Sequence, residues 1–126
     1  MSVQFLDFRE LSSREANAPS LRDGVSRGDS GIRERIAEYL DRADLLSVTT
    51  EPTYDVLADE EVEIGRYGTR TDGVWIWPFD LSHYVRTYNI SLPAEFVEWA
   101  AGLNWMPPAV SDERIDAIVE EITEGE

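Results

Sequence analysis

The sequence predicts an α+β domain in which three to four helices pack around a small antiparallel sheet. Apolar residues recur at helical spacing in several segments, and short segments rich in β-branched and aromatic residues lie between the first of these and the rest. A chain of 126 residues has the usual length of one domain, and a hydrophobic content of 42% is enough for a core. We therefore expect a single domain over residues 1–126.

The first thirty residues are expected to be rich in loops. Residues 4–8 favour a short strand, and Ser, Asn, Pro and Gly then accumulate as far as Gly31. We expect little more than one turn of helix in this segment. A compact acidic body should follow over residues 31–126.

The first long helix is predicted over residues 32–43. Its apolar side chains recur at helical spacing, and Asp29 or Ser30 is placed to cap its start. The buried stripe should consist of Ile32, Ile36, Tyr39, Leu40 and Ala43.

Strands are predicted in the middle of the chain. Residues 45–50 lead to Pro52, residues 53–57 favour a short strand, and Val62 and Ile64 alternate with charged residues. Residues 74–77 are strand formers, and Thr71-Asp72-Gly73 before them is typical of a turn, so we expect an antiparallel pair or meander. Trp75 and Trp77 would share one face of a central strand buried on both sides.

Two further helices should follow Pro78, and a third should end the chain. Asp80 can cap a helix that stops near Asn89, and Ser91 can cap the next one, with Pro93 in its first turn and Gly102 at its end. Ser111 opens the last helix, whose apolar face carries isoleucine and valine and whose opposite face is almost entirely acidic. The apolar stripes are Leu81, Tyr84, Val85 and Tyr88; Phe96, Val97, Ala100 and Leu103; and Ile115, Ile118, Val119 and Ile122.

The charge is strongly negative and unevenly distributed. The net charge is -15, and residues 48–126 hold 17 acidic residues against 4 arginines. Such a field repels nucleic acid phosphates and anionic membranes, and it accelerates encounters with basic proteins. A basic protein partner is therefore expected, with no direct binding to nucleic acid or membrane. The alternative is that the charge only keeps the protein soluble.

The sequence offers little for catalysis. Without cysteine, and with His83 as the only histidine, it supports neither a thiolate nucleophile nor a zinc site. No phosphate-binding loop, calcium loop or nucleophile elbow is present, and His83 itself is expected to face solvent or the edge of the core. We expect no enzyme activity, cofactor or metal. The absence of an export signal, a long apolar segment and cysteine predicts a cytoplasmic location.

The candidate partner-binding residues are mainly acidic. Carboxylates cluster between the predicted strands, near the turn at Asp72 that we expect to be exposed, and others lie on the last helix. Trp105 precedes two prolines, where it can either anchor an interface or plug the helix ends. The alternative for the acidic cluster is a solvated loop and strand edge. The predicted binding set is Asp59, Glu60, Glu61, Glu63, Asp72, Trp105, Glu120 and Glu121, with Glu124 beside the last two.

One stretch of the chain resembles a known class of proteins. It runs from a helix with Ile36 and Leu40 through Asp55-Val56, the Thr71-Asp72-Gly73 turn and Trp75-Ile76-Trp77-Pro78 to Leu92-Pro93-Ala94-Glu95-Phe96. This pattern, over residues 32–97, resembles small acidic actinobacterial proteins found beside polymorphic toxins. The resemblance implies an immunity protein that binds and blocks a cognate toxin domain. The matching residues are scaffold residues, so the resemblance implies no defined site.

The function predicted from the sequence is thus an immunity protein that covers the basic active site of a toxin domain. Nucleic acid mimicry is the alternative, in which rows of carboxylates imitate phosphates and occupy DNA-binding proteins. A small hydrolase that uses His83 is a weaker alternative.

Overall fold

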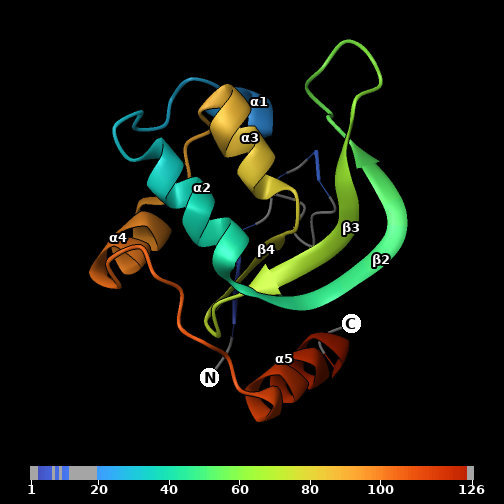
Figure 1. Ribbon diagram of the computed structural model, residues 1–126, viewed down its shortest axis with the longest axis vertical. Helices are drawn as coiled ribbons and strands as arrows, with labels where there is room; N and C mark the ends of the chain where they lie inside the picture. The colour runs from blue at the N-terminus through green and yellow to red at the C-terminus, as the bar shows by residue number, and fades with distance from the viewer. Residues whose placement is uncertain (1–2, 7, 9, 12–19, 125–126) are drawn as a thin grey trace.

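The computed structural model describes residues 3–6, 8, 10–11 and 20–124. The α+β fold is confirmed, and the elements follow one another in the order shown in Figure 1. They are β1 (Gln4–Phe5), α1 (Leu21–Gly24), α2 (Arg33–Arg42), β2 (Asp44–Tyr54), β3 (Glu63–Thr71), β4 (Trp75–Pro78), α3 (Leu81–Tyr88), α4 (Ala94–Gly102) and α5 (Asp112–Glu124).

The sheet has four strands in the order β1-β4-β3-β2. β4 pairs antiparallel with β3, and β3 with β2, but β1 lies parallel to β4. The expected antiparallel sheet is therefore mixed, because the chain crosses from β1 over several other elements before it reaches β4. Thr71, Asp72 and Gly73 form the expected turn before β4, and Gly73 has a φ of 97°.

β2 differs from the two separate segments predicted around Pro52. It is one strand of 11 residues, and its register with β3 shifts between Val48 and Pro52. Proline has no amide hydrogen for a neighbouring strand, but β2 lies at the edge of the sheet, where this is tolerated. Leu45 and Val48 are about half exposed, at 47% and 48%.

The main core lies between one face of the sheet and the helices α2, α3 and α4. Trp75 and Trp77 are buried there, as predicted, with Tyr39 of α2 and Phe96 of α4. Their rings pack at centroid distances of 5.4 to 6.0 Å, and Trp77 Nε1 donates a hydrogen bond to Leu40 O. These contacts fix the positions of α2 and α4 on β4.

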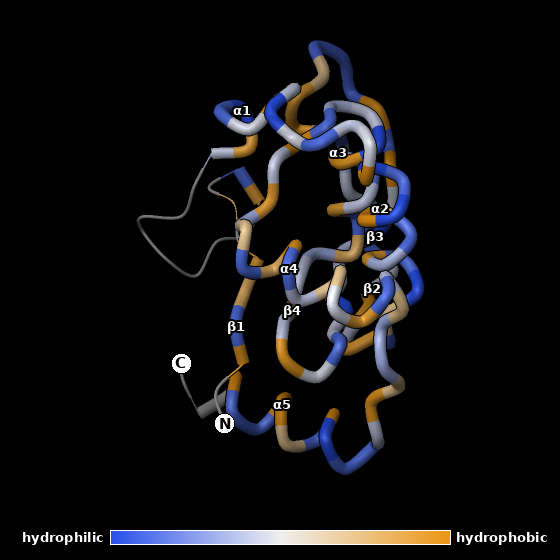
Figure 2. Tube along the Cα trace, turned by 90° about the vertical axis from the view of Figure 1, so that its left-hand side faces the viewer, coloured by the Kyte–Doolittle hydropathy of each residue, from blue (hydrophilic) through white to orange (hydrophobic). Residues whose placement is uncertain are grey.

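A smaller core covers the opposite face. Ile118 of α5 is buried against Ile76 and Val3, with Phe5, Leu46 and Ile122 packed around them. α5 lies at the lower end of the molecule, apart from the other helices (Figures 1 and 2). β4 is thus covered on both faces, which is why Trp-Ile-Trp can be apolar throughout.

The helix caps differ from those predicted. Ser111 does cap α5 by accepting a hydrogen bond from the Arg114 amide. Neither Asp29 nor Ser30 caps α2, and the Asp80 side chain, although at the start of α3, makes no capping hydrogen bond. α4 starts after Pro93 rather than at Ser91, and Gly102 lies within it, before a C-cap at Leu103.

Candidate binding site at the acidic loop

The acidic loop, defined here as residues 55–63, joins β2 to β3. Its base is closed by a hydrogen bond of 2.9 Å from the Asp55 amide to Val62 O, and it projects at the upper end of the molecule in Figure 1. Four exposed carboxylates lie on it, and none forms an ion pair or hydrogen bond with any residue that the structure describes. They are Asp59, Glu60, Glu61 and Glu63.

Asp55 anchors the loop to α3. Its Oδ1 accepts hydrogen bonds from the amides of Leu57 and Ala58, at 2.8 and 3.1 Å. Its Oδ2 lies 2.7 Å from His83 Nε2 and accepts a hydrogen bond of 2.8 Å from the Tyr88 hydroxyl. The carboxylate is only 4% exposed, so the base of the loop is fixed by a buried network.

A second contact supports the same anchor. Tyr84 of α3 accepts a hydrogen bond from the Val56 amide at 3.0 Å and donates one to Tyr54 O at 3.3 Å. The pKa of Tyr84 is raised to about 12, mainly by burial, so its hydroxyl stays protonated at neutral pH. Both sides of Asp55 are therefore attached to the same helix.

Asp55 itself stays ionised. Burial raises its pKa, but hydrogen bonds from His83, Tyr88 and the Leu57 amide outweigh this and hold the pKa below its usual value. The hydrogen bond to Asp55 also raises the pKa of Tyr88. This is the pattern of a carboxylate that serves as a structural acceptor.

His83, the only histidine of the sequence, has a second polar neighbour besides Asp55. Thr87 Oγ1 lies 3.5 Å from His83 Nδ1, at the outer limit of a hydrogen bond. The imidazole of His83 therefore lies between the Asp55 carboxylate and the Thr87 hydroxyl. Thr87 is exposed on the surface of α3, and neither residue lines the Asp80 cavity described below. The contact of His83 with Asp55 therefore supports an anchoring role for this histidine.

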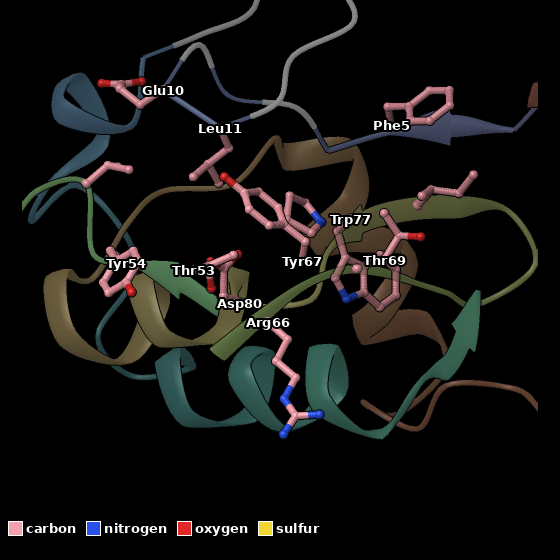
Figure 3. A pocket seen from close by; sticks show the side chains of 14 residues that line it. Phe5, Glu10, Leu11, Thr53, Tyr54, Arg66, Tyr67, Thr69, Trp77 and Asp80 are labelled. Carbon is pink, nitrogen blue, oxygen red and sulfur yellow. The ribbon is translucent and has the colours of Figure 1, made fainter. Parts of the chain in front are cut away.

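A cavity of about 180 Å³ adjoins the base of the loop. We call it the Asp80 cavity, and Figure 3 shows it from close by. Tyr54 and Val56, on either side of Asp55, contribute to the lining together with residues of β3 and β4. Phe5, Glu10 and Leu11 from the beginning of the chain also line it. Asp80 and Thr53 lie side by side within it (Figure 3).

Two of the polar side chains that line this cavity have few hydrogen-bond partners among the described residues. Asp80 is 9% exposed, and its carboxylate accepts no hydrogen bond of regular geometry from the described residues. Burial raises its pKa, and the neighbouring Thr53 hydroxyl offsets this only in part. Thr53 Oγ1 is buried without a hydrogen-bond partner in the part of the chain that the structure covers.

Asp72 does not belong to the exposed acidic surface, so this prediction is wrong. It is 3% exposed and accepts four hydrogen bonds. Oδ1 accepts from the amides of Val74 and Trp75, and Oδ2 from Tyr39 and Trp99 side chains. The turn is buried because α2 and α4 both send a donor to it.

The acidic residues of α5 lie far from the loop. Glu120 is exposed, whereas Glu121 is half-buried and accepts a hydrogen bond of 2.8 Å from the Val3 amide. α5 and the acidic loop occupy opposite ends of the molecule in Figure 1, so the predicted acidic surface is two separate regions. Nothing is described of the Glu124 side chain.

Trp105 is half-buried and packs against the main core beyond the end of α4. Its amide donates a hydrogen bond to Ala100 O, and both Asn104 and Trp105 have positive φ. This is the helix-end role left open by the sequence. A contribution to an interface stays a prediction.

Comparison with known proteins points to no further site. No family model, curated protein or solved structure matches the chain. Among the described residues, no group of three or more His, Asp or Glu is placed to hold a metal ion, and no helix is long and apolar enough to span a bilayer.

Proposed function

We propose that this protein is an immunity-type inhibitor, which binds a basic protein partner, a cognate toxin domain, through the acidic loop. The observation that carries the proposal is that four carboxylates without a partner among the described residues lie on a loop whose base is held by a buried residue. Asp59, Glu60, Glu61 and Glu63 are exposed and unpaired among the described residues, while Asp55 holds the loop that bears them.

The anchor matters because binding must order whatever loop it uses. A loop that is already fixed loses less conformational entropy when a partner docks, so more of the contact energy becomes affinity. Asp55 and Tyr84 fix both flanks of the turn that leads to the carboxylates. The loop therefore suits a rigid docking surface better than a merely solvated connection.

The charge supports the proposal through association kinetics. With a net charge of -15, the whole chain attracts a cationic protein, and the projecting loop is where its unpaired carboxylates concentrate at one end. Such steering raises association rates by roughly ten- to a thousandfold, and the effect falls with salt. Docking would then cover the basic surface on which the toxin binds its own substrate.

The test compares two variants with the same net charge. Glu60→Gln, Glu61→Gln and Glu63→Gln remove three charges from the loop, and Glu113→Gln, Asp116→Asn and Glu120→Gln remove three exposed charges from α5. The tagged wild-type chain first captures its partner from a lysate of the producing organism, and association rates are then measured with the purified partner. We expect the loop variant to associate at least about tenfold more slowly and the α5 variant to change much less.

Three outcomes would contradict the proposal. Equal slowing by both variants would mean that only net charge acts, and no slowing by either would move the interface away from the loop. Capture of many unrelated DNA-binding proteins, all released by salt, would favour nucleic acid mimicry instead.

A further inference from the structure

We propose that the Asp80 cavity receives one basic side chain, an arginine, from the partner protein. The inference rests on the proposed function, because it names the contact by which a cationic partner would be anchored beside the acidic loop. It concerns a cavity that the sequence did not predict.

The cavity contains a buried carboxylate that a cation would stabilise. Asp80 is the exception among the buried carboxylates of the described chain, since Asp55 and Asp72 each interact with four polar groups and Asp80 has no regular hydrogen bond. A buried carboxylate with few donors around it is costly, and a guanidinium supplies both opposite charge and donors. Thr53 Oγ1 adds an acceptor beside it that lacks a partner in the described chain.

The walls suit the rest of an arginine side chain. Tyr54, Tyr67 and Trp77 contribute aromatic surface, and about 180 Å³ is far more than the roughly 10–15 Å³ that one water molecule needs. Arginine packs its aliphatic stem on apolar surface and its guanidinium plane on aromatic rings. The cavity therefore matches both ends of the side chain.

Two of the described arginines near the cavity do not fill this role. Arg66 lines the cavity, but its side chain extends away from Thr53 and Asp80 in Figure 3. Arg70 is used elsewhere: its guanidinium lies 4.7 Å from the centre of the Phe79 ring and donates to Ala43 O. Neither forms an ion pair with Asp80, so the carboxylate is left for a group from outside the described chain.

The position of the cavity connects it to the acidic loop. Tyr54 and Val56 line the cavity, and Asp55 between them fixes the loop to α3. A partner that is steered to Glu60 and Glu61 would thus bring its surface over the cavity mouth. Steering and anchoring would be two steps of one docking event.

The experiment uses N-acetyl-arginine methylamide as a probe and the citrulline analogue as its neutral control. The full-length chain is titrated with each compound while backbone amide shifts are followed by NMR. We expect saturable shifts at Thr53, Tyr67 and Leu81 with the arginine compound. Binding should be at least about tenfold weaker with the citrulline compound, since it lacks the charge.

Two variants complete the experiment. Asp80→Asn should weaken arginine binding at least about tenfold, whereas Asp116→Asn, which removes an exposed charge from α5, should leave it unchanged. Unaltered amide shifts outside the cavity will show that Asp80→Asn keeps the fold. Equal binding of both compounds, or shifts confined to residues 59–63, would overturn the inference.

The probe separates this inference from the proposed function. Failure of the arginine titration alongside a loop-dependent complex would refute the cavity alone. If the probe binds but removal of the loop charges does not slow association with the partner, only the proposed function is refuted.

Discussion

Two buried carboxylates lie at the two ends of β4, and they differ in one respect. Asp72 precedes the strand and Asp80 follows it, and their exposed fractions are 3% and 9%. Asp72 accepts four hydrogen bonds, whereas Asp80 accepts none of regular geometry from the described residues. The same residue type in similar burial is therefore structural at one end of the strand, and we propose that it binds a partner at the other.

The difference follows from what packs around each residue. Asp72 lies in a tight turn whose amides point at its Oδ1, and Tyr39 and Trp99 reach Oδ2 from two helices. Asp80 begins α3, but its side chain does not turn back to the first helical amides. It points instead into a cavity. Burial with few hydrogen bonds thus distinguishes Asp80 from Asp72, whereas burial or charge alone does not.

The largest expected effect comes from Asp72→Asn. The amide replaces one carboxylate oxygen by a donor, which must then face either two backbone amides or the donors of Tyr39 and Trp99. We expect the free energy of unfolding to fall by about 2–3 kcal/mol. Urea denaturation followed by tryptophan fluorescence measures it. A loss below about 0.5 kcal/mol would mean that the four hydrogen bonds contribute little.

The next effect concerns Asp55 and pH. Its pKa in the folded protein is lower than in the unfolded chain, so its contribution is complete above the unfolded value of about 3.9 and is lost as pH falls through the folded value. Asp55→Asn should therefore cost about 1–2 kcal/mol at pH 7 and progressively less in acid. Unfolding curves between pH 3 and pH 7 test this. A cost that does not depend on pH would show that the carboxylate charge is not involved.

Asp80→Asn should change the free energy of unfolding in the opposite direction. The pKa of Asp80 is raised, so the folded state favours the neutral acid and loses stability as pH rises through the folded pKa. We expect the variant to be more stable by about 0.5–1 kcal/mol at pH 7, with a smaller gain near pH 4. His83 lowers the pKa of Asp80 and Asp55 raises it, and both effects are smaller than that of burial. A loss of stability at pH 7 would show that the carboxylate is satisfied and would weaken the cavity proposal.

The smallest effect is expected at an exposed pair. Arg86 contacts Glu34 at 3.0 Å and Asp41 at 2.6 Å, but its side chain is 37% exposed. Arg86→Ala should cost at most about 1 kcal/mol, and the cost should fall as salt is added. Thermal unfolding at two salt concentrations measures it. A salt-independent cost would point to packing of the arginine stem rather than charge.

Much of the fold followed from local patterns. Helical periodicity located α2, α3, α4 and α5, and the turn chemistry of Thr71-Asp72-Gly73 located the start of β4. The parallel pairing of β1 could not be predicted, because Gln4 and Phe5 carry no local sign of a partner some seventy residues away, at Trp75 and Ile76. The continuity of β2 through Pro52 likewise depends on its edge position, which is a property of the whole sheet.

The site was predicted less well than the fold. The acidic loop was visible as a cluster of carboxylates, but the sequence did not distinguish exposed Asp59 from buried Asp72, and both were placed in the predicted binding set. Asp55 is set apart by His83 and Tyr88, which lie five residues apart on α3 and meet it only in the folded chain. The sequence predicts a helix-capping role for Asp80. Only the structure shows that its side chain makes no capping hydrogen bond and lines a cavity instead.

The edge position of β2 has a consequence for handling the protein in solution. Residues 45–50 carry no charge, yet they form an exposed border of the sheet, which is a template for adding a strand from a second copy. At neutral pH, mutual repulsion between chains of charge -15 opposes such contact. Near the isoelectric point of about 4.3 this barrier disappears, so acid should convert a clear preparation into sheet-rich aggregates.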